Sequence, residues 1–339
     1  MSSTRYSRQE RLPWLGQSGQ GRIERSSVGI VGLGALGGTA AELLARAGVS
    51  RIVAVDRDIV DLSNLHRQIL YTEDDVRNRL PKAHAAAARL RSIRSDLDVQ
   101  AWNLDLGPEQ ALRLFREVDL VLDGTDNYET RYLLNDAAVH EDKPWIHSGV
   151  VGMAGSVLTV VPGESPCLRC LFPESPPPGT APTCDTAGVL GPAASFVASL
   201  QAAEALKILS RHTELLMEGM ARIDLLDFSV RLTSLPRDPQ CPCCGRRSFD
   251  YLEERKGSRT HSLCGRDAVM LVPERETRLD LAKAEQTLAA MSPVYRNSFI
   301  LQTEWEGHAV TLFTDGRAMI HGTQDVAFAR TLYARYLGM

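Results

Sequence analysis

The stretch Ser27-Val-Gly-Ile-Val-Gly-Leu-Gly-Ala-Leu-Gly-Gly38 decides the fold. Its first five residues are small or apolar and predict a short buried strand over 27–31, and a cluster of glycines, Gly32 to Gly38, follows directly. A helix of small apolar residues (39–47) and a second strand (51–55) follow. A strand, a helix and a strand in this order form a βαβ unit, and such units build parallel sheets.

The same alternation continues to about residue 228 and predicts an α/β fold, with a Rossmann-like, mainly parallel sheet and helices on both faces. The expected helices cover 82–92, 128–141 and 193–210, and the expected strands cover 118–122, 145–150, 156–161 and 222–228. Residues 1–27 and the stretch 162–192, rich in proline and glycine, carry no pattern of a regular element. A loop as long as 162–192 is typically functional or disordered.

A second pattern begins after the charged stretch 253–259, which has the composition of a linker. We therefore expect two domains, a larger first domain over 1–250 and a small α+β domain over 260–339. The expected elements of the second are a strand (268–272), a helix (279–290), strands at 298–304, 308–313 and 317–321, and a helix (324–336). Asp315-Gly316 between two of these strands is typical of a hairpin turn.

Composition narrows the class of protein. The chain has 339 residues, of which 44% are hydrophobic and 24% charged, and its net charge is −4. A nucleic-acid-binding protein would usually be basic, so we expect no nucleic-acid partner. No apolar run is long enough to span a membrane and no secretory leader is recognisable, which predicts a cytoplasmic protein without membrane contact.

The glycines after the first strand predict a nucleotide site. Gly32-x-Gly34-x-x-Gly37 permits a tight turn and lets phosphate approach the backbone at a helix N-terminus. Asp56 ends the second strand, where a carboxylate can accept hydrogen bonds from ribose hydroxyls. This pattern alone fits NAD as well as ATP. The alternative is a purely structural turn that binds no nucleotide.

Cations after Asp56 favour ATP. Arg67 lies in Ser63-Asn-Leu-His-Arg-Gln68, and Lys82 is one of five lysines in the chain. A triphosphate needs more positive charge than the pyrophosphate of NAD, which the glycine loop meets largely by itself. Either residue taken singly also fits a solvated surface charge.

A carboxylate follows the strand over 118–122, where open α/β sheets bind their ligands. In Asp123-Gly-Thr-Asp126-Asn127 we assign Asp126 as a Mg²⁺ ligand, because a hard cation prefers oxygen and Asp123 fits the end of the strand. The alternative is a turn in which these side chains cap the next helix.

Two Cys-x-x-Cys pairs predict a metal site. Cys167 and Cys170 form one pair, Cys241 and Cys244 the other, and four thiolates in two such pairs match a structural tetrahedral Zn²⁺ site. Cys243 is a spare that could replace a ligand, although the spacing favours Cys244. The remaining thiols are Cys184, a candidate nucleophile in the proline-rich stretch, and Cys264, which fits a small buried residue better.

Together these motifs resemble the ThiF/MoeB family of ubiquitin-activating-like adenylyltransferases. The resemblance runs from about Tyr6 to Gly245 and includes Arg131, Gly188-Val-Leu-Gly191 and Leu200-Gln-Ala-Ala-Glu-Ala-Leu-Lys207. It implies a homodimer that uses ATP and Mg²⁺ to adenylate the C-terminal glycine of a small ubiquitin-like sulfur carrier ending in Gly-Gly. Ala35 departs from the family pattern, which usually has a second consecutive glycine there.

The resemblance also implies roles for individual residues. Asp56 would bind ribose, Asn64, Arg67 and Lys82 the phosphates, and Arg8 would reach the ATP site of the partner subunit. Cys184 matches a loop cysteine implicated in thioester or acyl-disulfide chemistry in some members. The nucleotide-binding set is Gly32, Gly34, Ala35, Asp56, Ser63, Asn64, Arg67, Gln68, Lys82, Asp126 and Asn127, and the catalytic set is Arg8, Arg67, Lys82, Asp126 and Cys184.

Several alternatives stay open at this stage. The carrier could serve thiamine, molybdopterin or tRNA thiolation, or be conjugated to proteins, and the C-terminal extension favours the thiamine type. A sulfur donor, either a cysteine desulfurase or a rhodanese, is an expected second partner. The rival functions are an NAD-dependent oxidoreductase and a non-catalytic adaptor.

Overall fold

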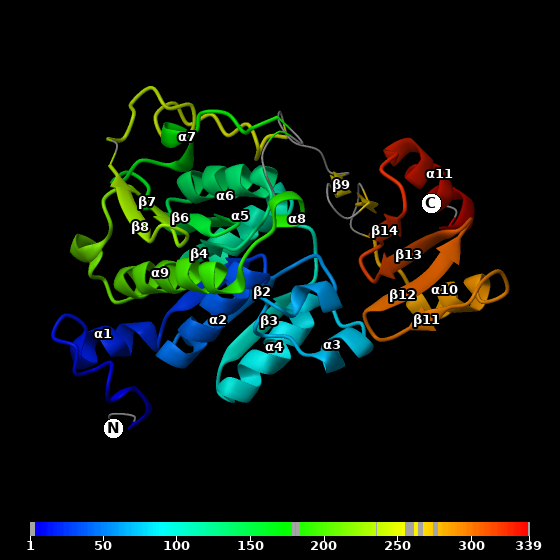
Figure 1. Cartoon of the computed structure of the whole chain (residues 1–339), viewed down its shortest axis with the longest axis horizontal. Helices are drawn as coiled ribbons and strands as arrows, with labels where there is room; N and C mark the ends of the chain where they lie inside the picture. Colours follow the sequence, from blue (N-terminus) through cyan, green and yellow to red (C-terminus); the bar gives the residue numbers. More distant parts are fainter. Residues whose placement is uncertain are drawn as a thin grey trace. The chain divides into compact units, whose positions relative to one another are not determined.

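The computed structural model describes residues 4–177, 180, 184–234, 236–254, 261–263, 267–273 and 277–337. The chain divides into two compact units, Met1–Lys256 and Gly257–Met339. Each unit is built around a sheet of its own, and each has its own hydrophobic core (Figure 1). The predicted boundaries, 1–250 and 260–339, stay a prediction, because most residues between 254 and 267 lie outside the described part of the chain.

An eight-stranded sheet forms the centre of the first unit, in the order β3-β2-β1-β4-β5-β6-β7-β8. The five strands from β3 to β5 pair in parallel, and β6, β7 and β8 continue the sheet in antiparallel pairs. The strands are β1 (Ser27–Val31), β2 (Arg51–Val55), β3 (Asp98–Trp102), β4 (Leu120–Asp123), β5 (Trp145–Val151), β6 (Ala154–Val160), β7 (Met220–Asp224) and β8 (Ser229–Thr233). The predicted α/β class is confirmed.

Helices cover both faces of this sheet. Apolar residues of α2, α4 and α9 pack on one face, and those of α5 and α6 pack on the other (Figure 1). Because β1 and β2 are covered on both faces, their sequences are continuously apolar rather than alternating. The helices are α1 (Gly16–Ile23), α2 (Ala35–Ala47), α3 (Glu73–Arg77), α4 (Lys82–Ile93), α5 (Pro108–Glu117), α6 (Tyr128–His140), α7 (Leu168–Leu171), α8 (Cys184–Ala187) and α9 (Gly191–Leu209), with 3₁₀ turns η1 (Thr4–Tyr6), η2 (Leu62–Asn64) and η3 (Thr213–Leu215).

Two sequence predictions were wrong. Residues 1–27 are not irregular, because α1 forms there and buries Gln20, whose amide donates to the carbonyl of Ala47 at 3.0 Å. This contact depends on a distant helix, so no local pattern announces it. The stretch 162–192 contains α7, α8 and the start of α9, and Pro192 lies in the first turn of α9, where a missing N–H costs nothing. The sequence reading also left out β3, α5 and β8.

The second unit contains a six-stranded antiparallel sheet in the order β11-β12-β13-β14-β10-β9. Two helices pack their apolar residues into one core with this sheet. The hairpin between β13 and β14 turns at Asp315-Gly316 as predicted, and Gly316 has a φ of +80°, which glycine adopts without strain. The elements are β9 (His261–Leu263), β10 (Ala268–Leu271), α10 (Leu281–Leu288), β11 (Tyr295–Arg296), β12 (Ile300–Trp305), β13 (His308–Phe313), β14 (Ala318–His321) and α11 (Val326–Leu337).

Among the described helices, none combines the length and the apolar composition that crossing a membrane requires.

Candidate functional site

The glycine turn between β1 and α2 is shaped by close backbone contacts. Gly32 has a φ of +82°, and a Cβ there would lie 2.7 Å from the carbonyl of Gly124. A Cβ on Gly37 would meet the carbonyl oxygen of Gly32 at 1.8 Å, so both positions require glycine. Gly34 differs, because the nearest atom to its Cβ position is Nε2 of Gln68 at 3.6 Å. A Cβ at Gly34 would therefore make an ordinary contact with Gln68 and no backbone clash, and phosphate could approach the start of α2 here.

Asp56 links this turn to the end of β2. Its carboxylate accepts from the backbone N–H of Leu33 at 2.7 Å and from that of Asp58 at 2.8 Å. Burial raises the pKa of Asp56, against the opposing charge of Lys82. Each carboxylate oxygen has a second lone pair, so both can still accept from a ribose hydroxyl.

Lys82 forms an ion pair that the sequence reading missed. It lies in the first turn of α4 with 3% of its side chain exposed, and its Nζ donates to Asp58 Oδ2 at 3.2 Å. Asp58 was not among the predicted residues, although its place two positions after Asp56 puts both carboxylates at one strand end. The positive charge of Lys82 is thus held in place by Asp58 at the edge of the sheet.

The segment around η2 brings three predicted residues to the same edge. Asn64 and Gln68 are buried, whereas Arg67 is half-buried and its guanidinium donates to the carbonyl of Ser63 at 3.0 Å. The side-chain oxygen of Gln68 is buried and has no hydrogen-bond partner among the described residues. A buried acceptor without a partner is costly and fits a group that a ligand satisfies.

Asp123 and Asp126 have opposite surroundings. Asp123 ends β4 and is fully buried, as the sequence reading expected when it assigned metal binding to Asp126 instead. Asp126 is exposed, and its carboxylate contributes with those of Asp105 and Asp58 to raising the pKa of Arg57, whose burial opposes its charge. Asn127 caps α6 by accepting from the N–H of Thr130 at 2.9 Å. The expected cap is therefore made by Asn127, and the carboxylate of Asp126 faces solvent.

A buried polar cluster supports the loop that carries Asp126. His147 on β5 contacts Asp123 with an Nδ1–Oδ2 distance of 2.7 Å, and Nε of Arg131 lies 3.4 Å from the same oxygen. The side chain of Thr125 donates to the other oxygen at 2.6 Å. Burial opposes the charge of Asp123, but the bond from His147 and the charge of Arg131 keep its pKa below the ordinary value. His147 had no motif to reveal it, since β5 otherwise reads as an apolar strand.

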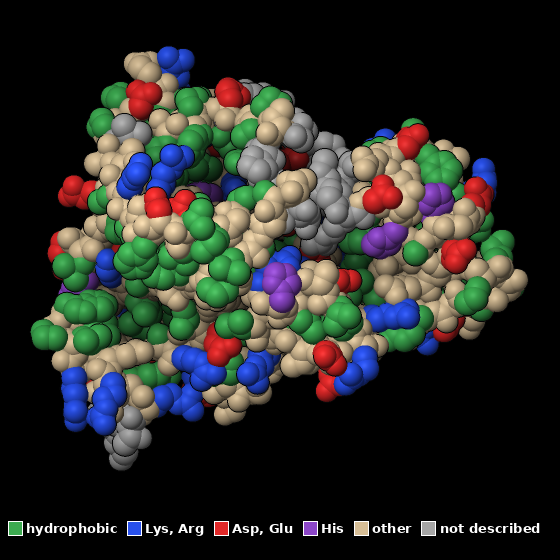
Figure 2. All heavy atoms as spheres, in the orientation of Figure 1, with side chains coloured by type: hydrophobic (Ala, Val, Ile, Leu, Met, Phe, Trp, Pro, Cys, Tyr) green, Lys and Arg blue, Asp and Glu red, His purple; other side chains and the backbone are tan. Residues whose placement is uncertain are grey.

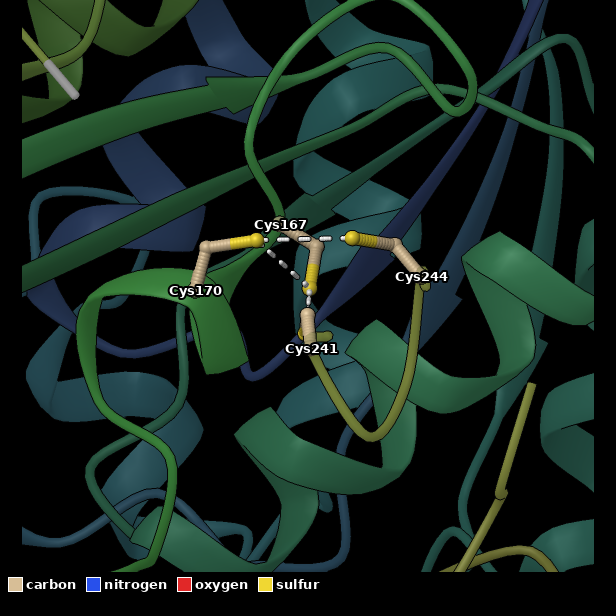
Figure 3. A group of neighbouring side chains, drawn as sticks. All are labelled: Cys167, Cys170, Cys241 and Cys244. Carbon is tan, nitrogen blue, oxygen red and sulfur yellow. Dashed lines mark hydrogen bonds between the residues drawn. The ribbon is translucent and has the colours of Figure 1, made fainter. Parts of the chain in front are cut away.

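Four predicted cysteines form one cluster, in which all sulfur atoms lie within 4.8 Å of one another (Figure 3). Sulfur–sulfur distances are 3.6 Å for Cys167 and Cys241, 3.9 Å for Cys167 and Cys170, and 3.4 Å for Cys170 and Cys244. Thiolates at about 2.3 Å from a tetrahedral zinc ion lie about 3.8 Å apart, which matches these distances. The cluster could bind zinc.

Cys243 is not one of the four clustered cysteines, as the spacing of the Cys-x-x-Cys pairs predicted. It is fully buried, and its sulfur accepts from the side-chain amide of Asn135 at 3.2 Å. The oxygen of the same amide accepts from the N–H of Leu168, next to Cys167. Asn135 thus ties the two Cys-x-x-Cys segments to α6.

The backbone that follows Cys184 is bonded to the turn after the carboxyl end of β5. The N–H of Gly152, in the turn between β5 and β6, donates to the carbonyl of Gly188 at 2.8 Å, and the N–H of Leu190 donates back to Gly152 at 2.9 Å. A Cβ on Gly191 would lie 3.1 Å from the carbonyl of His66, so α9 starts directly against the Arg67 segment. Cys264 lies outside the described residues, and the role expected of it stays a prediction.

The structure thus brings most predicted nucleotide residues to the carboxyl ends of β1, β2 and β4. Arg8 is different: it is exposed in the N-terminal segment between η1 and α1. Its predicted role in a partner subunit is a matter of assembly rather than of this chain alone.

Comparison with known sequences decides the family. The sequence pattern of the ThiF family matches residues 6–243, which is more than half of the chain. The chain belongs to the ThiF family.

Three relatives in the ThiF family have names that state an activity. The chain is 42% identical over 336 residues to the sulfur carrier protein ThiS adenylyltransferase of Bacillus subtilis, covering 98% of this chain and 99% of that protein. It is 44% identical over 257 residues to the sulfur carrier protein adenylyltransferase of Thermus thermophilus (73% and 94%), and 40% identical over 250 residues to the SAMP-activating enzyme E1 of Haloferax volcanii (74% and 92%). The alignment to the Bacillus protein includes most of the second unit.

Solved structures share the ThiF-family fold. Escherichia coli MccB superposes with a TM-score of 0.64 at 23% identity, covering 73% of this chain and 74% of that chain. PaaA superposes with a TM-score of 0.58 at 22% identity, covering 69% and 73%. At this identity the likeness concerns the fold.

Proposed function

We propose that this protein adenylates the C-terminal glycine of a small ubiquitin-like sulfur carrier. The observation that carries the proposal is the edge formed by the carboxyl ends of β1, β2 and β4, which brings together the glycine turn, the exposed carboxylate of Asp126 and the buried Lys82–Asp58 ion pair. The relatives from Bacillus and Thermus are named for this activity, and the former aligns over the whole chain. The family implies ATP as the nucleotide.

The residues at this edge fit ATP. α2 begins at Ala35, directly after Gly34, so its N-terminal N–H groups could bind phosphate. The carboxylate of Asp56 can still accept hydrogen bonds from a ribose. The unpartnered oxygen of Gln68 lies in the same region and can accept from an amino or hydroxyl group. Arg67 and Lys82 would neutralise phosphate charge, with the buried Asn64 beside them and with Ser63 and Asn127 as further contacts.

Asp126 fits a Mg²⁺ ligand. Its carboxylate is exposed and makes no hydrogen bond within the described part of the chain, so its oxygens are free to bind a cation. Mg²⁺ in nucleotide sites is held by one or two carboxylates and the substrate phosphates, which matches a single exposed aspartate. When bound, the ion would supply positive charge to the departing pyrophosphate.

The chemistry needs no general base. The terminal carboxylate of the carrier is ionised at neutral pH, and its oxygen attacks the α-phosphorus of ATP while the bond to the β-phosphate oxygen breaks. The products are an acyl adenylate and pyrophosphate, and no proton has to move. The protein would therefore act by positioning the two reactants and by neutralising charge with Arg67 and Lys82.

Zinc at the cysteine cluster would be structural. Four sulfur ligands close a tetrahedral site and leave no position for substrate. The ion would join the segment of α7 to the segment at Cys241–Cys244, which are separated by about 70 residues of sequence.

Exposed apolar surfaces support two protein partners. The edge strand β8 and the turn before it expose Leu226 and Phe228 at 79% each and Val230 at 62%, and an exposed apolar edge strand is a common docking element. We assign the surface of β8 to the carrier, because β8 belongs to the same sheet as β4, the strand that precedes Asp126. Hydrophobic side chains also gather over α9 (Figure 2), where Phe196 is 43% exposed, and we assign this face to a second copy whose Arg8 completes the site.

The cytoplasm is the proposed compartment. The five cysteines whose side chains are described are free thiols, which is typical of a reducing environment. A sulfur donor, either a cysteine desulfurase or a rhodanese, would act after adenylation.

Cys184 is proposed for that later sulfur step, because the backbone after it is anchored beside the carboxyl end of β5. We expect Cys184→Ala to keep ATP–pyrophosphate exchange within about twofold, since adenylation transfers no group to or from a thiol. Thiocarboxylate formation on the carrier, followed by mass spectrometry, should fall strongly. Loss of exchange itself would make the cysteine structural.

The experiment that tests the proposed function is ATP–pyrophosphate exchange with a panel of carriers from thiamine, molybdopterin and tRNA thiolation systems. Each carrier is paired with a form lacking its terminal glycine as a matched control. Exchange with one intact carrier and none with its shortened form is expected and would identify the pathway. Absence of exchange with every carrier, in a protein that binds ATP and zinc, would favour the adaptor function.

A further inference from the structure

The position of Asp126 is determined by its neighbours rather than by its own side chain. The residue before it, Thr125, is 7% exposed, and its carbonyl accepts from Nη2 of Arg131 at 2.6 Å. The residue after it, Asn127, is fixed as the cap of α6. The carboxylate of Asp126 is exposed between these two anchors, so whatever fixes Thr125 also fixes Asp126.

Asp123 is the common acceptor behind Thr125. Its Oδ1 accepts from the N–H of Thr125 at 2.8 Å and from the hydroxyl at 2.6 Å. Its backbone carbonyl accepts from Ser148 at 2.7 Å and from Gln201 at 2.8 Å. The backbone of Asp123 is therefore held by β5 and α9, and its carboxylate is oriented by Thr125 at Oδ1 and by further groups at Oδ2.

His147 and Arg131 are the groups that contact Oδ2. An ionised carboxylate can only accept, so Nδ1 of His147 carries the proton of the 2.7 Å bond. Nε of Arg131 lies farther away, at 3.4 Å, and its guanidinium is also engaged with Thr125. His147 therefore makes the shorter contact to the oxygen that orients Asp123.

We propose that His147 is a positioning residue for magnesium binding, acting through Asp123 and Thr125 on the carboxylate of Asp126. The inference rests on the proposed function, because it concerns the Mg²⁺·ATP complex. It adds a residue that no nucleotide motif contains, on a strand that carries no other predicted site residue. His147 touches neither nucleotide nor metal in this arrangement, and its effect is on the geometry of a ligand.

The test compares three variants that differ in where they place a donor. His147→Asn puts an amide N–H near the position of Nδ1 and keeps the bond to Asp123, whereas His147→Gln places its amide farther out and loses that bond. His140→Asn serves as the matched control, because His140 is exposed on the distant end of α6. ATP binding is measured by calorimetry across a Mg²⁺ titration, without carrier.

We expect the Mg²⁺ concentration for half-maximal tightening of ATP binding to rise about 10-fold in His147→Gln, as for residues that orient metal ligands. His147→Asn and His140→Asn should stay within about twofold of the unmodified protein, and metal-free ATP affinity should change in none of them. An unchanged Mg²⁺ response in His147→Gln overturns the proposal. Equal loss of metal-free and metal-dependent affinity also overturns it, since that pattern belongs to general structural damage.

The two proposals fail separately. Because the readout is nucleotide binding, a protein with the expected Mg²⁺ response but no exchange with any carrier refutes the proposed function alone. If His147→Gln does not fold, Thr125→Val decides, because it removes the hydroxyl donor to Asp123 in the same chain of contacts. A Mg²⁺ response in Thr125→Val equal to that of the unmodified protein then overturns the inference.

Discussion

The cysteine cluster and the nucleotide edge both assemble residues from distant parts of the sequence, yet they use their polar atoms differently. At the cluster, four sulfur atoms face one another and are mostly buried. At the edge, Lys82 pairs with Asp58 and Asp56 holds the glycine turn. A closed metal site thus directs its groups to one point, whereas the open edge uses Lys82, Asp58 and Asp56 to hold its own shape.

This difference separates stability from activity. Groups that converge on one ion should matter mainly for folding, and the exposed group at the edge should matter mainly for turnover. Four predictions test that separation.

The largest effect is expected for Asp126→Ala. Removing this exposed carboxylate should lower ATP–pyrophosphate exchange about 10³-fold, because charge on the leaving pyrophosphate loses its metal. The free energy of unfolding should stay within about 0.5 kcal/mol, since the side chain makes no hydrogen bond among the described residues. Exchange near the original rate would refute the assignment of Asp126.

Cysteine substitutions should give the opposite result. In Cys170→Ser we expect zinc content, measured by mass spectrometry of the metal, to fall well below about one ion per chain, with a loss of several kcal/mol of unfolding free energy. Cys243→Ser is the comparison, because Cys243 bonds to Asn135 and lies against Cys167 without being one of the four clustered cysteines. If Cys243→Ser loses zinc and Cys170→Ser keeps it, the ligand set is wrong.

Deletion of 257–339 tests whether the second unit contributes to carrier docking. Because this unit has its own core, the remaining chain should fold and bind ATP normally. We expect KM for the carrier to rise about tenfold, which corresponds to about 1.4 kcal/mol of binding. An unchanged KM for the carrier would exclude the unit from docking it.

The smallest effect concerns pH. Burial lowers the pKa of His147, opposed by its bond to Asp123, and Arg131 lowers it further. The folded state therefore binds fewer protons than the unfolded state below pH about 6.5, and stability is lost as pH falls from there through the folded pKa. The decrease in unfolding free energy between about pH 7.5 and about pH 5.5, measured by urea titration, should be smaller in His147→Asn.

Comparing His147→Asn with the unmodified protein cancels the contribution of a second histidine. Burial and Arg91 also lower the pKa of His84, which acts in the same direction, but His84 is present in both proteins. Equal pH dependence in the two would mean that His147 does not contribute.

Sequence alone predicted the α/β class and the four clustered cysteines, because hydrophobic runs and Cys-x-x-Cys spacing are local signals. It missed α1, whose contact through Gln20 is formed only in three dimensions. It also missed Asp58 and His147, which act by pairing with residues from other elements. Their roles depend on which strand ends become neighbours, and no local pattern records that.

The anchor at Gly188 sets a limit on where Cys184 can work. They lie four positions apart, and an extended chain spans at most about 3.6 Å per residue. The Cα of Cys184 therefore stays within about 14 Å of the anchor beside Gly152 in any conformation. If Cys184 acts in the sulfur step as proposed, this tether would select carriers by reach, because the activated tail of a docked carrier would have to end near that radius.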